Sequence, residues 1–168
     1  LIVLGRHGTE DDLYQWCEEG LQEVSNIPNL WKISVLSGKK CNEDELPDIG
    51  IISRSGVHNL DIHKNNLPFL KKVSFVVVVE PSRLVTTAQI GLNLLIKCCG
   101  SSRAITYCSV DRNCDGLVDA LSHILMTNIT EVSATEYPQG ISSYMYWTAD
   151  AEYLQNRILP GISRCLGM

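Results

Sequence analysis

The feature that most constrains the fold of this chain is an unbroken apolar segment near its middle. Residues 73–79 read Val-Ser-Phe-Val-Val-Val-Val and are followed directly by Glu80, Pro81, Ser82 and Arg83. A β-branched run of this kind predicts a strand buried on both faces, which is typical of a parallel sheet covered by helices. Ligands of such sheets bind beyond the carboxyl ends of the strands, so Glu80 to Arg83 are candidates for function.

Strand-like and helix-like segments alternate along the whole chain. This alternation implies βαβ crossovers and predicts a three-layer α/β fold, with a mainly parallel sheet and helices on both faces. No repeat or linker divides the 168 residues, so we expect one domain, 1–168, and the apolar start at Leu1 suggests a fragment of a larger protein. The expected strands are 1–4, 31–36, 49–52, 73–79, 104–108 and 129–134, and the expected helical segments are 9–24, 57–70, 82–99, 114–126 and 149–165.

The composition is that of an ordinary globular protein. Apolar residues make up 45% and charged residues 20%, and the net charge of -5 is not that of a dedicated nucleic-acid binder. No stretch approaches the roughly 20 apolar residues of a membrane span, and no signal peptide is present, so we expect an intracellular protein, cytoplasmic or nuclear. The seven cysteines contain no C-x-x-C spacing, which predicts reduced thiols and no zinc site.

Five loops are expected at the carboxyl edge of the sheet, at 5–9, 37–41, 53–56, 80–83 and 109–115. None of them contains the G-x-x-x-x-G-K-[ST] sequence that cradles nucleotide phosphates. Ser37-Gly38-Lys39-Lys40 has the Gly-Lys pair but lacks the upstream glycine and the hydroxyl that binds Mg²⁺. We therefore expect no tight ATP binding by this chain and no bound cofactor.

The first of these loops, Arg6-His7-Gly8-Thr9, resembles the signature of histidine phosphatases. The resemblance implies that His7 attacks phosphorus while Arg6 and Arg83 bind the phosphoryl oxygens. Such chemistry also needs a second histidine and an acidic proton donor. Candidates are His123 for the former and Glu80 or Glu136 for the latter. A phosphohydrolase is therefore one alternative function.

The last loop resembles the first half of a calcium-binding loop. Asp111, Asn113 and Asp115 have the required spacing, but Ser122 stands where a bidentate glutamate is needed. These residues are better suited to capping the following helix. We expect no metal site here.

Taken together, the segments from the first strand onward follow a characteristic order. A strand ends in Ser37-Gly38-Lys39-Lys40, and Asp48-Ile-Gly-Ile-Ile-Ser53 precedes the valine strand. After the next helix, Ala104-Ile-Thr-Tyr-Cys-Ser109 leads to Asn113-Cys-Asp-Gly-Leu-Val-Asp-Ala-Leu121. This order resembles the first RecA-like domain of a superfamily 2 helicase or translocase of the Swi/Snf type, over most of the chain.

The resemblance implies that the motor activity is lost. Glu80 stands where that family has an acidic pair that holds Mg²⁺ and activates water, but the next residue is proline. Ser109 and Asp111 stand where the family has its Ser/Thr-Ala/Gly-Thr coupling motif, and only Ser109, at the first position, matches it. The loops that follow nucleic acid in the family correspond to those of Arg6 and Arg54.

We therefore expect a RecA-like domain that is inactive as an ATPase and serves as a scaffold or regulatory binding module in a larger assembly. The expected partners are other domains of the same chain or other proteins, with no membrane partner. A nucleic-acid-binding module that uses Arg6, Arg54, Ser109 and Asp111 is the remaining alternative.

Overall fold

The computed structural model describes residues 1–5, 31–99, 104–109, 116–132 and 143–147. The helices expected at 9–24 and 149–165 lie outside these residues. The described part includes the valine strand and everything from residue 31 to residue 99, so it tests the central part of the expected alternation.

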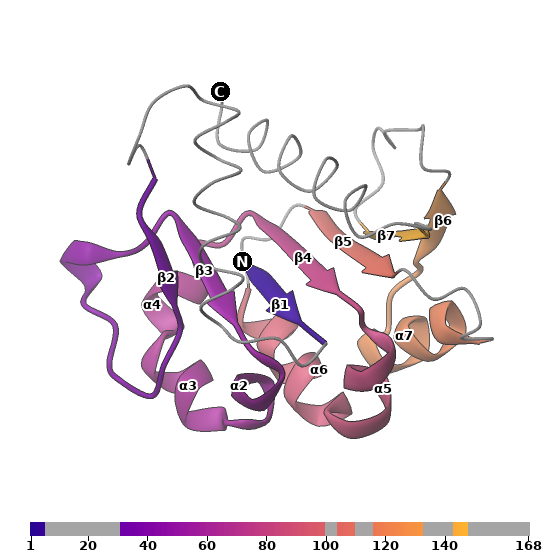
Figure 1. The fold of residues 1–168 in the computed structure, drawn as a ribbon, viewed down its shortest axis with the longest axis horizontal. Helices are drawn as coiled ribbons and strands as arrows, with labels where there is room; N and C mark the ends of the chain where they lie inside the picture. The colour runs from indigo at the N-terminus through magenta and orange to yellow at the C-terminus, as the bar shows by residue number, and fades with distance from the viewer. Residues whose placement is uncertain (6–30, 100–103, 110–115, 133–142, 148–168) are drawn as a thin grey trace.

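The described strands form a single sheet in which every pairing is parallel (Figure 1). The strands are β1 (Ile2–Leu4), β2 (Ile33–Val35), β3 (Ile49–Ile52), β4 (Phe75–Val79), β5 (Ala104–Ser109), β6 (Thr130–Val132) and β7 (Ser143–Trp147). Their order in the sheet is β2-β3-β1-β4-β5-β7-β6. Consecutive parallel strands need crossover connections, so the predicted α/β fold class is confirmed.

The valine strand β4 lies in the interior of this sheet, between β1 and β5. Val77 is in register with Ile2 on one side and with Thr106 on the other. Val76, Val77 and Val78 are all buried. Because successive strand residues point to opposite faces, the sheet is covered on both faces at this point. This confirms the prediction made from the valine run.

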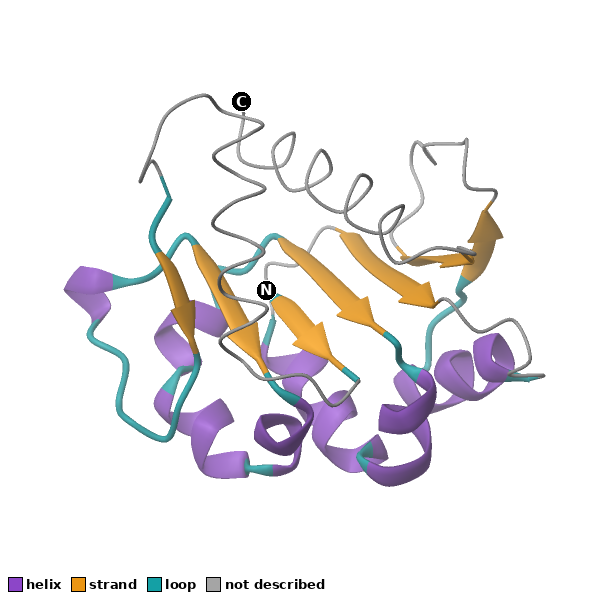
Figure 2. Cartoon of the chain, in the orientation of Figure 1, coloured by secondary structure: helices purple, strands orange, loops and turns teal. Residues whose placement is uncertain are grey.

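The described α-helices lie together on one face of the sheet, below it in the view of Figure 2. Valines and leucines of this face, among them Val78 of β4 and Leu92 of the helical layer, form one buried apolar cluster. The described helices are η1 (Glu43–Glu45, a 3-10 helix), α2 (Arg54–His58), α3 (Leu60–Asn65), α4 (Leu67–Leu70), α5 (Ser82–Thr87), α6 (Gln89–Cys98) and α7 (Leu117–Leu125).

The single helix predicted for 82–99 is in fact two helices, α5 and α6, which meet at Ala88. Ala88 has a non-helical backbone, with φ -137° and ψ 30°. Just before it, the hydroxyls of Thr86 and Thr87 donate hydrogen bonds to the carbonyl of Arg83, at 3.1 and 2.6 Å. Threonines that bond back to the preceding turn bend and weaken a helix, which accounts for the break. The prediction of one continuous helix was wrong.

The strand predicted at 129–134 is present as β6, but it is neither the last strand nor a buried one. It lies at the edge of the sheet, and its first two residues are exposed. The segment Ser143–Trp147, where no strand was predicted, forms β7, which pairs with β5 along its length. Met145 of β7 is buried. The two tyrosines and the tryptophan of this segment have a high propensity for strands, and pairing with both β5 and β6 favours the strand.

Candidate functional site

Glu80 occupies a constrained position at the carboxyl end of β4. Its φ of 54° is in the left-handed region, which is rare for residues other than glycine, and its side chain is only 8% exposed. Beside it, the amide of Gly5 donates a hydrogen bond to the carbonyl of Val79 (2.7 Å). A Cβ atom on Gly5 would overlap the carbonyl oxygen of Glu80. The chain therefore turns away from the sheet here in a tightly packed backbone junction.

The loops that follow β3 and β4 are joined by a short series of hydrogen bonds. Arg54 of α2 is half-buried, and its Nη2 donates to Oγ1 of Thr87 in α5 (3.3 Å). Oγ1 of Thr87 donates in turn to the carbonyl of Arg83 (2.6 Å), whose side chain is exposed. Arg54 and Arg83, two of the residues predicted to bind a ligand, are thus brought to the same edge of the sheet through Thr87.

Next to this link lies an open groove of about 370 Å³. Its walls are the end of α2 and the start of α3 on one side and the junction of α5 with α6 on the other. Two of its aliphatic side chains are unusually open to solvent, Leu60 at 52% and Ile90 at 76% exposed. The residues that line the groove include His58, Leu60, Thr86, Thr87, Gln89 and Ile90.

The groove is held in shape by a close crossing of α2 and α6. Gly91 is buried at this crossing, and a Cβ atom on it would overlap the carbonyl oxygen of Val57. Only glycine lets the two backbones approach so closely. Because Gly91 follows Ile90 directly, this contact fixes the position of Ile90 relative to α2.

Sequence reasoning missed this groove, although α6 carries a signal of it. Apolar residues occur on more than one side of the helix, whereas a helix that only covers a sheet has one apolar stripe. Leu92 and Leu95 form the buried stripe, while Ile90 and Leu94, one turn apart, are 76% and 38% exposed. The second stripe could have been found by counting apolar residues around the helix.

His63 of α3 is buried near the floor of this region, at 4% exposed. Among the described residues, neither ring nitrogen has a hydrogen-bond partner of good geometry. Burial lowers the pKa of His63 below its ordinary value of 6.5, and the nearby carbonyls of Val57 and Gly56 oppose this effect only in part. His63 is therefore a buried core residue rather than an exposed ligand.

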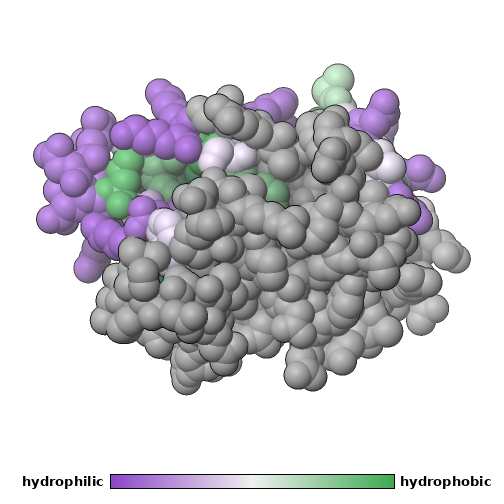
Figure 3. All heavy atoms as spheres, turned by 90° about the horizontal axis from the view of Figure 1, so that it is seen from above, coloured by the Kyte–Doolittle hydropathy of each residue, from purple (hydrophilic) through white to green (hydrophobic). Residues whose placement is uncertain are grey.

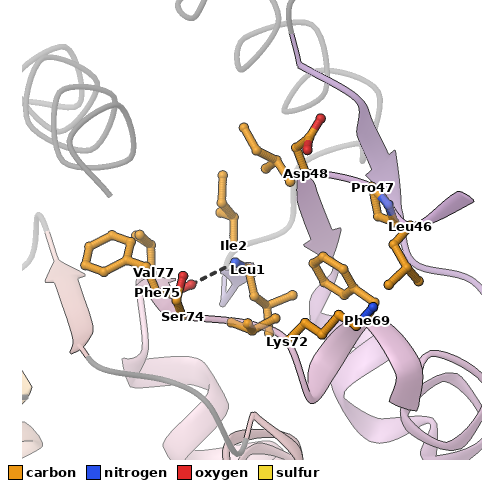
Figure 4. Close-up of a pocket in the computed structure, with 12 residues that line it drawn as sticks. Leu1, Ile2, Leu46, Pro47, Asp48, Phe69, Lys72, Ser74, Phe75 and Val77 are labelled. Carbon is orange, nitrogen blue, oxygen red and sulfur yellow. Dashed lines mark hydrogen bonds between the residues drawn. The ribbon is translucent and has the colours of Figure 1, made fainter. Parts of the chain in front are cut away.

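A second cavity, of about 250 Å³, lies at the amino ends of the strands. Its lining is mainly apolar and includes Phe69, Phe75 and Val77, as Figure 4 shows. Among its polar residues, Asp48 accepts a hydrogen bond from the amide of Lys32 (2.8 Å). In the view from above, a group of apolar side chains is visible at the surface between hydrophilic ones (Figure 3). Since ligands of parallel sheets bind at the carboxyl edge, the groove beside Thr87 is the better candidate site.

Some of the predicted site residues lie outside the part of the chain that the structure describes, and others lie within it. Arg6, His7 and Asp111 lie outside the described residues, as does Glu136. Ser109 is the last residue of β5, paired with Trp147. His123 is exposed on α7, away from the apolar core. Within the described ranges, no three histidine, cysteine, aspartate or glutamate side chains gather as a metal site would require.

No protein family, curated protein or solved structure that was compared with this chain matches it. In the part that the structure describes, no helix has the length and apolar character needed to cross a membrane. The site is therefore interpreted from its own geometry.

Proposed function

We propose that this chain is a catalytically degenerate, helicase- or translocase-like domain that serves as a scaffold or regulatory binding module in a larger assembly. The all-parallel sheet with the valine strand in its interior is compatible with such an origin. The observation that carries the proposal is the burial of Glu80, which is the one carboxylate of the segment that follows β4.

A motor domain needs carboxylates that reach Mg²⁺ and water at the end of this strand, because Mg²⁺ prefers oxygen ligands and retains several waters. Glu80 is 8% exposed, so its carboxylate has little access to a hydrated ion. Val79 before it and Pro81 after it carry no carboxylate. The segment thus supplies one buried acid where the chemistry uses two accessible ones.

The positive part of the proposal, binding of a partner, is supported by the groove beside Thr87. Leu60 and Ile90 leave a large part of their apolar surface in water on the walls of a preformed hollow. Contiguous exposed apolar surface rimmed by polar groups marks interaction sites in soluble proteins. This exposed apolar surface can support the binding of a partner, and such binding does not require a nucleotide.

Isothermal titration calorimetry with Mg-ATP tests the loss of motor function. We expect no heat of binding from the full chain at concentrations up to the millimolar range. Micromolar affinity that disappears in Glu80→Gln would show that Glu80 still holds a metal and would overturn the proposal. Glu43→Gln, the same change at an exposed residue of η1, is the control for a nonspecific effect of charge.

A further inference from the structure

We propose that the groove between α3 and the junction of α5 with α6 binds an acidic amphipathic helix of a protein partner. This inference rests on the proposed function as a binding module and names the kind of partner. It is carried by three features of the described residues: an unpartnered apolar stripe, a rigid floor and a local excess of positive charge.

The apolar stripe is formed by side chains from two helices. Ile90 of α6 and Leu60 at the start of α3 line the groove, and Leu94 continues the exposed stripe of α6 one turn beyond Ile90. All three are more exposed than their buried neighbours in these helices, Leu92 and Leu95. An amphipathic helix places apolar side chains at positions i, i+3, i+4 and i+7, which suits a groove with apolar anchors along both walls.

The floor of the groove is already in place before a partner binds. The close contact of Gly91 with the carbonyl of Val57 fixes α6 against α2. The hydrogen bond from Arg54 to Thr87 fixes α5 against α2 at the other end. A preformed site loses less conformational entropy on binding, so modest apolar contacts suffice for measurable affinity.

The charge of these helices is opposite to that of the whole chain. Helices α2, α3, α5 and α6 carry four basic residues and one acidic residue, in a protein with a net charge of -5. Two of the basic residues continue the apolar stripes by one turn: Lys64 follows Leu60 on α3, and Lys97 follows Leu94 on α6, and both are exposed. Complementary charge selects a partner and its orientation, so the partner helix is acidic.

The aliphatic character of the anchors favours protein over nucleic acid as the partner. Proteins hold unpaired bases by stacking them on aromatic rings, and base stacking supplies much of the affinity for single strands. The exposed anchors of this groove, Leu60 and Ile90, are aliphatic and have no flat face on which a base could stack, and the one ring among the described lining residues is the imidazole of His58. Aliphatic anchors on helices that also carry separate lysines and arginines match a helix with leucines and glutamates.

Selection from a displayed library of random peptides of about 16 residues, four to five turns of helix, tests the inference on the full chain. We expect the enriched peptides to be acidic, with apolar residues at i, i+3 or i+4, and i+7. Fluorescence anisotropy of a selected peptide should show binding weakened about tenfold or more by Ile90→Glu, as for a residue at the centre of an interface. Met126→Glu, which introduces the same charge at an exposed methionine outside the groove, should leave the affinity unchanged.

Charge reversal gives a second and independent readout. In a variant with Lys64→Glu and Lys97→Glu, the library should yield basic instead of acidic peptides. The control variant, Lys39→Glu with Lys40→Glu, changes the net charge equally in an exposed turn and should still yield acidic ones. All four lysines are exposed, so circular dichroism should show both variants folded.

Three outcomes would overturn the inference. The first is the absence of enriched peptides, or enrichment that Ile90→Glu does not affect. The second is binding of a labelled single-stranded oligonucleotide that Ile90→Glu or the Lys64 and Lys97 reversal abolishes. The third is self-association of the chain, seen by sedimentation, that Ile90→Glu abolishes. None of these results depends on ATP, so they leave the calorimetric test of the proposed function to be judged separately.

Discussion

The carbonyl oxygen of Glu80 lies where the Cβ atom of any residue larger than glycine at position 5 would have to be. We therefore predict that Gly5→Ala destabilises the fold, because β1 and the turn after β4 must separate to make room. Overpacking of this kind costs about 1 to 3 kcal/mol. Urea denaturation followed by circular dichroism measures the loss as a lower midpoint with an unchanged slope.

Gly38→Ala is the matched control for this change. Nothing lies within 4 Å of a Cβ atom on Gly38, and the residue is exposed. The free energy of unfolding should stay within about 0.5 kcal/mol of the parent value. Equal effects of the two substitutions would contradict the close approach of Gly5 to Glu80.

Gly91→Ala sets two effects against each other. Alanine favours a helix over glycine by up to about 1 kcal/mol, but its Cβ atom would overlap the carbonyl of Val57. Since that obstacle is backbone and cannot rotate away, we predict a net loss of stability of about 1 to 3 kcal/mol. Amide hydrogen exchange should show faster opening of α2 and α6, measured by mass spectrometry of their peptides.

Ile90→Ala in the same helix is the control. The side chain of Ile90 is mostly in solvent, so its truncation should change the free energy of unfolding by less than about 0.5 kcal/mol. A gain in stability for Gly91→Ala would mean that helix propensity outweighs the crossing, and that α2 and α6 are not held together there.

The central fold could be predicted because the sequence pattern and the burial agree there. The valine run has no polar residue between Val76 and Val79, so only a strand in the interior of a sheet accommodates it. The break at Ala88 could not be predicted in the same way. It depends on hydroxyl hydrogen bonds of Thr86 and Thr87, which become visible only once the helix is built.

For the candidate site, the sequence indicated only an edge of the sheet, the carboxyl edge, where the groove lies. Arg54 and Arg83 were chosen as cations, and the structure brings both to that edge through Thr87, a residue with no motif to mark it. The groove itself depends on Gly91, whose role comes from the approach of Val57, a residue 34 positions earlier in the chain. Contacts of this kind join segments that are far apart along the chain, so no motif with a fixed spacing marks them in the sequence.

His63 makes the stability of the fold depend on pH. Burial keeps its pKa below 6.5 in the folded state, whereas the unfolded chain takes up a proton near the ordinary value. The unfolded state therefore binds more protons as the pH falls below about 6.5, and linkage requires that stability decreases there. The contribution is fully present above that pH and is lost as the pH falls toward the lower folded value.

We predict that His63→Leu removes this part of the pH dependence. The urea midpoint of the parent should fall between about pH 7.5 and pH 5 by more than that of the variant, since leucine has no proton to bind. His58→Gln, which removes an exposed histidine from the neighbouring helix, should behave like the parent. Parallel curves for the parent and His63→Leu would contradict a buried, neutral His63.

Cys99 is predicted to resist alkylation while the protein is folded. Burial raises the pKa of its thiol to about 12, and the thiolate is the reactive form. Its neighbour Cys98 is half-buried and so is the natural internal control on the same peptide. With iodoacetamide at about pH 8, tandem mass spectrometry should find label on Cys98 well before Cys99 in the native protein, and on both in denaturant. Equal labelling of the two residues in the native protein would show that the end of α6 opens readily. A thiol that is buried like that of Cys99 can react only after the surrounding structure separates.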